Sequence, residues 1–136
     1  MNSLAVPRNV MWAGVGLVAV VGLIHLIEAP EYFDEYGAFY GLAFLANAAA
    51  AAVAAVGIYG GIKSWGWTLG AVISGGAFVL YLVSRTIGLP GLTGGAFFEP
   101  IGLLSLLVEG LFVVLYARVV GPRRYASPAR GPLARG

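Results

Sequence analysis

Histidine and acidic side chains, which can transfer protons or bind cations, gather in one stretch of this sequence. Residues 25–36 hold the only histidine, His25, and four of the six acidic residues. His25 and Glu28 are three positions apart, so on a helix they share a face. Histidine with carboxylates can bind a divalent metal ion, which makes His25 and Glu28 candidate metal ligands. The absence of cysteine and of a second histidine excludes a thiolate site and leaves any metal or cofactor unassigned.

A second set of polar residues stands inside otherwise apolar sequence. Its members are Asn47, Ser74, Ser105 and Glu109. An acidic residue within a membrane costs about 3 kcal/mol when ionised and is a candidate functional group. Glu109 could be a protonated hydrogen-bond partner of Asn47 or Ser74 that holds helices together. It could equally be a proton or cation relay, or part of a small-ligand pocket, and the sequence leaves these alternatives open.

The overall composition indicates that a membrane surrounds these residues. Hydrophobic residues make up 60% of the chain and charged residues 10%, and the mean hydropathy is +0.88. Soluble domains carry roughly 25% charged residues. So few charges cannot cover a surface that faces water, so an integral membrane protein is predicted. Twenty-one glycines and the alanine run at residues 48–52 indicate closely packed helices.

Four apolar stretches are long enough to cross a bilayer, because about 20 helical residues span its hydrocarbon core. The predicted fold is an all-α four-helix transmembrane bundle in one membrane domain, residues 1–120, with spans at 10–27, 38–59, 67–84 and 101–120. Pro30 is expected to end the first helix, because proline lacks an N–H and restricts the residue before it. Residues 28–36 would then form an acidic loop. The first apolar run is too long for a signal peptide, and no Ala-x-Ala pattern follows it.

Basic residues fall on one side of this topology. They occur before the first span, in the second loop and from the end of the fourth span onward, at Arg8, Lys63, Arg118, Arg123, Arg124, Arg130 and Arg135. The two other loops carry acidic residues against Arg85 alone. The positive-inside rule therefore predicts cytoplasmic termini in a multi-pass protein of the plasma membrane. Residues 121–136 are predicted to be a disordered basic tail that can contact anionic lipids.

Distances along the helices sort the polar residues into two layers. The intramembrane polar layer comprises Asn47, Ser74, Ser105 and Glu109. Three of them lie about 12 to 15 Å from the outer ends of their spans, and Ser105 lies one helical turn further out than Glu109. At that depth the first span offers Gly16 and Leu17. The outer polar cluster comprises His25, Glu28, Tyr81, Arg85 and Glu99. An arginine at a helix end needs a partner or water, so an ion pair of Arg85 with Glu28 or Glu99 is favoured over a metal site.

Several segments together form a recognisable pattern. They are His25 with Ala29-Pro30, residues 41–46, the string Ser-Arg-Thr-Ile-Gly-Leu-Pro at residues 84–90, and Glu99-Pro-Ile-Gly followed by Glu109. The pattern resembles a group of small four-span membrane proteins from actinobacteria and related bacteria, over most of residues 25–110. The Ser-Arg-Thr-x-Gly-Leu-Pro string is its most specific part. The group commonly has a second histidine soon after Ala-Pro, where this chain has Tyr32. The resemblance implies the four-span architecture and these candidate residues, and no particular activity.

Three classes of function fit these residues. The first is a non-enzymatic binding or accessory membrane protein with the outer polar cluster as its contact surface. This class requires the fewest special properties of the residues present. A transporter or channel subunit would use Glu109 as a proton or cation site and would need a homo-oligomer, because four short helices can hardly enclose a path. A membrane enzyme would need a metal or redox cofactor near His25. The expected partners are the lipid bilayer and a second copy or another membrane protein, with no nucleic acid.

Overall fold

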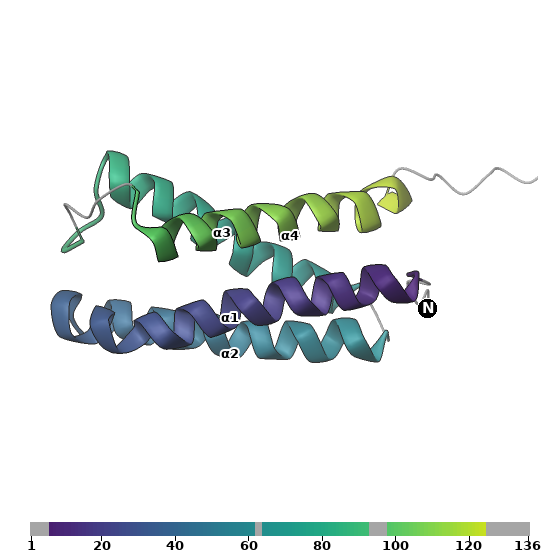
Figure 1. The fold of residues 1–136 in the computed structure, drawn as a ribbon, viewed down its shortest axis with the longest axis horizontal. Coiled ribbons are helices and arrows are strands. Elements are labelled where there is room, and N and C mark those ends of the chain that lie inside the picture. Colours follow the sequence, from purple (N-terminus) through teal and green to yellow (C-terminus); the bar gives the residue numbers. More distant parts are fainter. Residues whose placement is uncertain (1–5, 62–63, 93–97, 125–136) are drawn as a thin grey trace, which may run out of the picture.

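The structure is a computed structural model that describes residues 6–61, 64–92 and 98–124 (Figure 1). Four helices account for nearly all of these residues: α1 (Arg8–Tyr36), α2 (Ala38–Gly60), α3 (Trp65–Thr86) and α4 (Pro100–Arg124). Each helix contains a segment long and apolar enough to cross a membrane. The all-α four-helix architecture predicted from the sequence is therefore confirmed.

The first helix is longer than predicted. It continues through Pro30 to Tyr36, so the prediction that Pro30 ends it, and that residues 28–36 form a loop, is wrong. A proline removes one backbone hydrogen bond from a helix, but the last turns pack against α2. The Phe33 ring covers Gly41 so closely that a Cβ at Gly41 would collide with it. Gly37, with φ +90°, is the single residue between α1 and α2.

The other helix ends lie close to their predicted positions. α2 ends one residue later than predicted. α3 begins two residues before the predicted span and ends two residues after it. α4 begins at Pro100 and continues to Arg124, four residues into the segment predicted to be a disordered tail. The tail beyond residue 124, and the predicted loop residues Lys63 and Phe97, lie outside the described residues.

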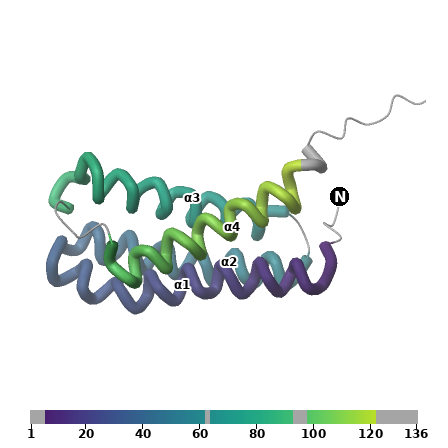
Figure 2. Tube along the Cα trace, turned by 45° about the horizontal axis from the view of Figure 1, so that its top comes forward, coloured from purple at the N-terminus to yellow at the C-terminus, as the bar shows by residue number. Residues whose placement is uncertain are grey.

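The helices form an up-and-down bundle of two layers (Figures 1 and 2). α1 and α2 lie side by side in one layer, and α3 and α4 form the other. α1 makes its most extensive contact with α2 and touches α3 only sparsely. The beginning of α1 and the end of α4 lie at the same end of the bundle, and the α1–α2 and α3–α4 connections lie at the opposite end. We call the half that holds the beginning of α1 and the end of α4 the terminal half. The half that holds the α1–α2 and α3–α4 connections is called the open half.

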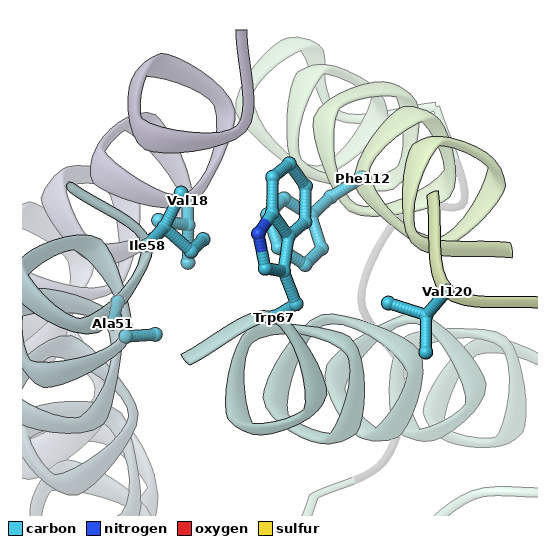
Figure 3. Packing of buried hydrophobic residues seen from close by; sticks show 7 residues of the cluster. Val18, Ala51, Ile58, Trp67, Phe112 and Val120 are labelled. Atoms are coloured by element: carbon cyan, nitrogen blue, oxygen red, sulfur yellow. The ribbon is translucent and has the colours of Figure 1, made fainter. Parts of the chain in front are cut away.

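The terminal half contains the apolar core of the bundle (Figure 3). Its buried residues come from all four helices: Val18, Ala51, Ala54, Ile58, Trp67, Phe112 and Val120. The Trp67 and Phe112 rings stack with their centroids 5.9 Å apart. Glycines let the helices approach, because a Cβ at Gly66 would lie 2.7 Å from the backbone of Gly57. This small-residue contact between α2 and α3 is the close packing that the glycine content predicts.

Candidate functional site

The open half contains a cavity of about 930 Å³. All four helices and the α3–α4 connection line it. Its walls are mainly apolar and aromatic, with polar groups at a few points. The volume lies within the range of about 300–1,000 Å³ that is typical of small-molecule sites in proteins.

His25 and Glu109 meet at the buried base of this cavity. His25 is 7% exposed and Glu109 is 1% exposed. His25 Nδ1 lies 2.9 Å from the Val21 carbonyl oxygen. A carbonyl only accepts, so Nδ1 carries the proton and donates it. In the neutral ring Nε2 therefore has a lone pair, and it lies 4.0 Å from Glu109 Oε1, which is too far for a direct hydrogen bond.

The meeting of His25 with Glu109 differs from the two-layer arrangement expected from the sequence. His25 was expected in the outer polar cluster, and Gly16 or Leu17 was expected at the depth of Glu109. The error follows from Pro30, because counting from a helix end at residue 27 placed His25 at the surface. Since α1 continues to Tyr36, His25 lies about 16 Å from that helix end at 1.5 Å per residue. The depth of His25 and that of Glu109 therefore match.

Glu109 takes its hydrogen bond from its own helix. Ser105 Oγ donates to Glu109 Oε1 over 2.7 Å, across one helical turn. Neither Asn47 nor Ser74, the two partners proposed from the sequence, bonds to Glu109. Asn47 instead donates through Nδ2 to the Ile73 carbonyl oxygen at 3.5 Å. The second oxygen of Glu109 is buried without a hydrogen-bond partner in the described part of the chain.

Two other buried oxygens share this condition. Asn47 Oδ1 and Ser74 Oγ have no hydrogen-bond partner among residues 6–61, 64–92 and 98–124. Asn47 lines the cavity together with Ser105 and Glu109, whereas Ser74 does not. Three of the four residues of the predicted intramembrane polar layer thus converge on one space, and Ser74 packs elsewhere.

Arg85 and Glu99 form an ion pair at the mouth of the cavity. Arg85 Nη2 donates to Glu99 Oε2 over 2.8 Å, and the Arg85 side chain is 6% exposed against 51% for Glu99. The guanidinium also lies 5.2 Å from the centre of the Tyr81 ring. The pairing of Arg85 with a carboxylate is therefore confirmed for Glu99. Glu28 lines the same cavity and makes no ion pair with any described residue.

A ladder of aromatic rings connects the base of the cavity to its mouth. Phe44 lies 4.9 Å from the His25 ring and stacks on Tyr32 at 3.8 Å, between ring centroids. Tyr32 then contacts Tyr36 at 5.2 Å, and Tyr36 contacts Tyr40 at 6.4 Å. We call these four rings, Tyr32, Tyr36, Tyr40 and Phe44, the ring ladder. The Tyr40 hydroxyl donates to the Pro90 carbonyl oxygen and so ties α2 to the α3–α4 connection.

Sequence reasoning assigned no role to the ring ladder as a cavity wall. Tyr32 and Tyr36 fall in residues 28–36, which the sequence predicted to be an acidic loop. The signal was present, because Tyr32 with Tyr36 and Tyr40 with Phe44 each stand four residues apart and so share a helix face. That signal could be used only if residues 28–36 were recognised as helical.

The site has the features of a binding pocket more than those of a metal centre. No group of three or more His, Asp or Glu side chains in the described residues could hold a metal ion. No family model, curated protein or solved structure matches this chain. The cavity is therefore the feature that bears on function, and the resemblance noted from the sequence stays a prediction.

Proposed function

We propose that this chain is a membrane protein that binds a small molecule in the cavity of its open half, without transforming it chemically. The observation that supports this proposal is the cavity of about 930 Å³, whose base presents buried polar atoms with no partner in the described chain. Unpaired buried polar atoms cost stability, about 1–3 kcal/mol each. A ligand that supplies their hydrogen bonds offsets this cost and gains affinity from it.

Binding is favoured over passage across the membrane by the contrast between the two halves. The cavity occupies the open half, while Trp67, Phe112 and their neighbours pack the terminal half. A ligand could enter from one end and would meet a closed core at the other. This arrangement is that of a one-sided binding site.

Transport is the second candidate, and the pairing of His25 with Glu109 favours it. Two titratable groups 4.0 Å apart at the base of a cavity could hand on a proton or a cation. Such a role requires an oligomer or a conformational change that opens the terminal half. Native mass spectrometry would give the oligomeric state, and proton flux into liposomes should then be lost in Glu109→Gln. Flux equal to that of protein-free liposomes would rule transport out.

We further propose that the cavity opens to the outside of the plasma membrane and that both termini are cytoplasmic. The support is the charge distribution, with Lys and Arg concentrated near the termini and in the α2–α3 connection. Because the chain has no cysteine, single cysteines at Glu31 and at Gly136 can be labelled in intact cells with an impermeant reagent. Labelling at position 31 alone is expected, and labelling at position 136 alone would invert the orientation.

Filling the cavity provides the test of binding. Gly76 lines the cavity, and a Cβ at this position meets nothing within 4 Å. Leucine there should occupy the ligand space without disturbing the backbone. Gly16 on α1 has equally open surroundings but does not line the cavity, so Gly16→Leu is the matched control.

The binding measurement uses three related probes: phenylbutylammonium, phenylbutanol and phenylbutyrate. At least one should bind saturably to the full chain in detergent and to Gly16→Leu. The same probe should bind Gly76→Leu at least about tenfold more weakly, since a loss of about 1.4 kcal/mol of binding free energy already has that effect. Failure of all three probes to distinguish Gly76→Leu from the other proteins would overturn the proposal.

A further inference from the structure

Three residues at the base of the cavity, His25, Asn47 and Glu109, offer hydrogen-bond acceptors. His25 Nε2 is an acceptor because Nδ1 donates to Val21. Asn47 Oδ1 is an acceptor because the amide nitrogen is committed to Ile73. The unpartnered Glu109 Oε2 completes the set when Glu109 is ionised, because a carboxylate only accepts. A ligand that satisfies this base must therefore bring donors.

The spacing of His25 and Glu109 fits a bridging donor. Their facing atoms, Nε2 and Oε1, are 4.0 Å apart, too far for a hydrogen bond to each other. A nitrogen placed about 2.9 Å from both atoms can bond to each of them at once. A primary ammonium group carries three N–H donors, as many as the residues that offer acceptors here.

The charge of the cavity lining also favours a positive ligand. Three described carboxyl groups line it, those of Glu28, Glu99 and Glu109, against the single guanidinium of Arg85. Arg85 is already paired with Glu99 through Nη2, and its buried Nε has no hydrogen-bond partner in the described part of the chain. With His25 neutral, the lining is therefore net negative, whether Glu109 is ionised or not. An anionic ligand would meet repulsion, and a cation would gain attraction in surroundings of low dielectric constant.

The ring ladder suits the remainder of such a ligand. Tyr32 and Phe44 stack with their ring centroids 3.8 Å apart beside His25, and the ladder leads from there to the mouth. Aromatic faces attract cations and bury apolar surface. An aromatic or aliphatic body can thus lie along the rings while its charged end reaches Glu109.

We propose that the cavity binds a small organic ammonium ion whose N–H groups donate to Glu109, His25 and Asn47 and whose apolar body lies along the ring ladder. This inference rests on the proposed binding function and specifies its ligand class. An alcohol of the same shape carries one donor and no charge. A trimethylammonium ion carries the charge and no N–H donor. The two analogues therefore separate the contributions of hydrogen bonding and of charge.

Isothermal titration of the full chain in detergent with phenylbutylammonium, phenylbutanol and phenylbutyltrimethylammonium tests the ligand class. Phenylbutylammonium should bind the wild type about tenfold more tightly than either analogue, because each lost bond to a charged group costs about 1.5–3 kcal/mol. This comparison is made on one protein, so no variant has to fold for it to be decisive.

Two carboxylate variants locate the charged end of the ligand. Glu109→Gln removes the charge while keeping size and the acceptor for Ser105, and it should weaken phenylbutylammonium about tenfold to a hundredfold. Glu35→Gln removes an equal charge from an exposed residue of α1 that does not line the cavity, and its effect should stay below about threefold, because water and salt screen an exposed charge outside the site. Melting curves of both variants control for folding.

The outcomes distinguish this inference from the function on which it rests. Equal or tighter binding of phenylbutanol, or an affinity for phenylbutylammonium that Glu109→Gln leaves unchanged, would overturn the ammonium site. If Gly76→Leu still abolished the binding of that probe, small-molecule binding itself would stand. Identical binding of all probes by wild type and Gly76→Leu would overturn both.

Discussion

Glycines on the same helix have opposite roles in the two halves of the bundle. In the terminal half, Gly66 touches the backbone of α2, and a Cβ at Gly70 would lie 2.5 Å from the Phe112 ring. In the open half, Gly76 faces space, with no atom within 4 Å of a Cβ placed there. A small residue therefore closes a helix contact only where a partner fills the room that it leaves. Where no partner does, it enlarges a cavity.

The largest expected effect comes from deleting a core ring in the terminal half. Phe112 is fully buried and stacks on Trp67, so Phe112→Ala should lower the free energy of unfolding by about 3–5 kcal/mol. Phe44→Ala is the matched change in the open half, where the ring is only partly buried and lines the cavity, and it should cost about 1–2 kcal/mol. Equilibrium unfolding in mixed micelles measures both. Equal losses would mean that the two halves are packed alike.

A milder contrast uses two glycines of α3. Gly66→Ala puts a methyl group against the backbone of Gly57 and should cost about 1–3 kcal/mol, as overpacking does. Gly76→Ala meets nothing and should stabilise the protein by up to about 1 kcal/mol through helix propensity. The melting temperatures of the two variants should therefore move in opposite directions. A loss of stability in Gly76→Ala would show that the open half closes on itself.

The ion pair at the mouth should have the smallest effect. Arg85 is buried against Tyr81 and Glu99, but Glu99 is half exposed, so the pair should contribute about 1 kcal/mol or less. Arg85→Ala should lower the melting temperature more than Arg85→Lys, because lysine keeps the charge without the forked geometry. Glu99→Gln should resemble Arg85→Ala, and Glu28→Gln should have no effect. Indistinguishable melting temperatures across the set would mean that the pair does not hold the mouth together.

Most of the fold could be predicted from the sequence, because apolar runs of about 20 residues have few alternatives to transmembrane helices. The one large error concerns the end of α1. Local rules give Pro30 a strong tendency to end a helix, and only the tertiary contacts of Tyr32 and Phe33 with α2 show why the helix continues. Such contacts depend on how two helices face each other, which composition and spacing do not specify.

The candidate site was predictable in its members more than in its arrangement. Glu109 and Asn47 were placed at one depth by counting residues, with Ser105 one turn outward, and these three residues do line one cavity. His25 was misplaced, since its depth depends on where α1 ends. The cavity could not be predicted, because its lining comes from all four helices and the α3–α4 connection, and how these pack against one another is not specified by composition or spacing.

The protonation of Glu109 with and without ligand tests the central claim most directly. Burial away from cations disfavours a charged carboxylate within a membrane, so Glu109 should be neutral in the empty cavity at neutral pH. An ammonium ion bound beside it should convert it to a carboxylate. Isotope-edited infrared spectra, with Glu109→Gln to assign the band, should show a protonated carboxyl band that disappears as phenylbutylammonium saturates the protein. A band for Glu109 that stays unchanged throughout the titration would contradict a binding site at the base of the open half.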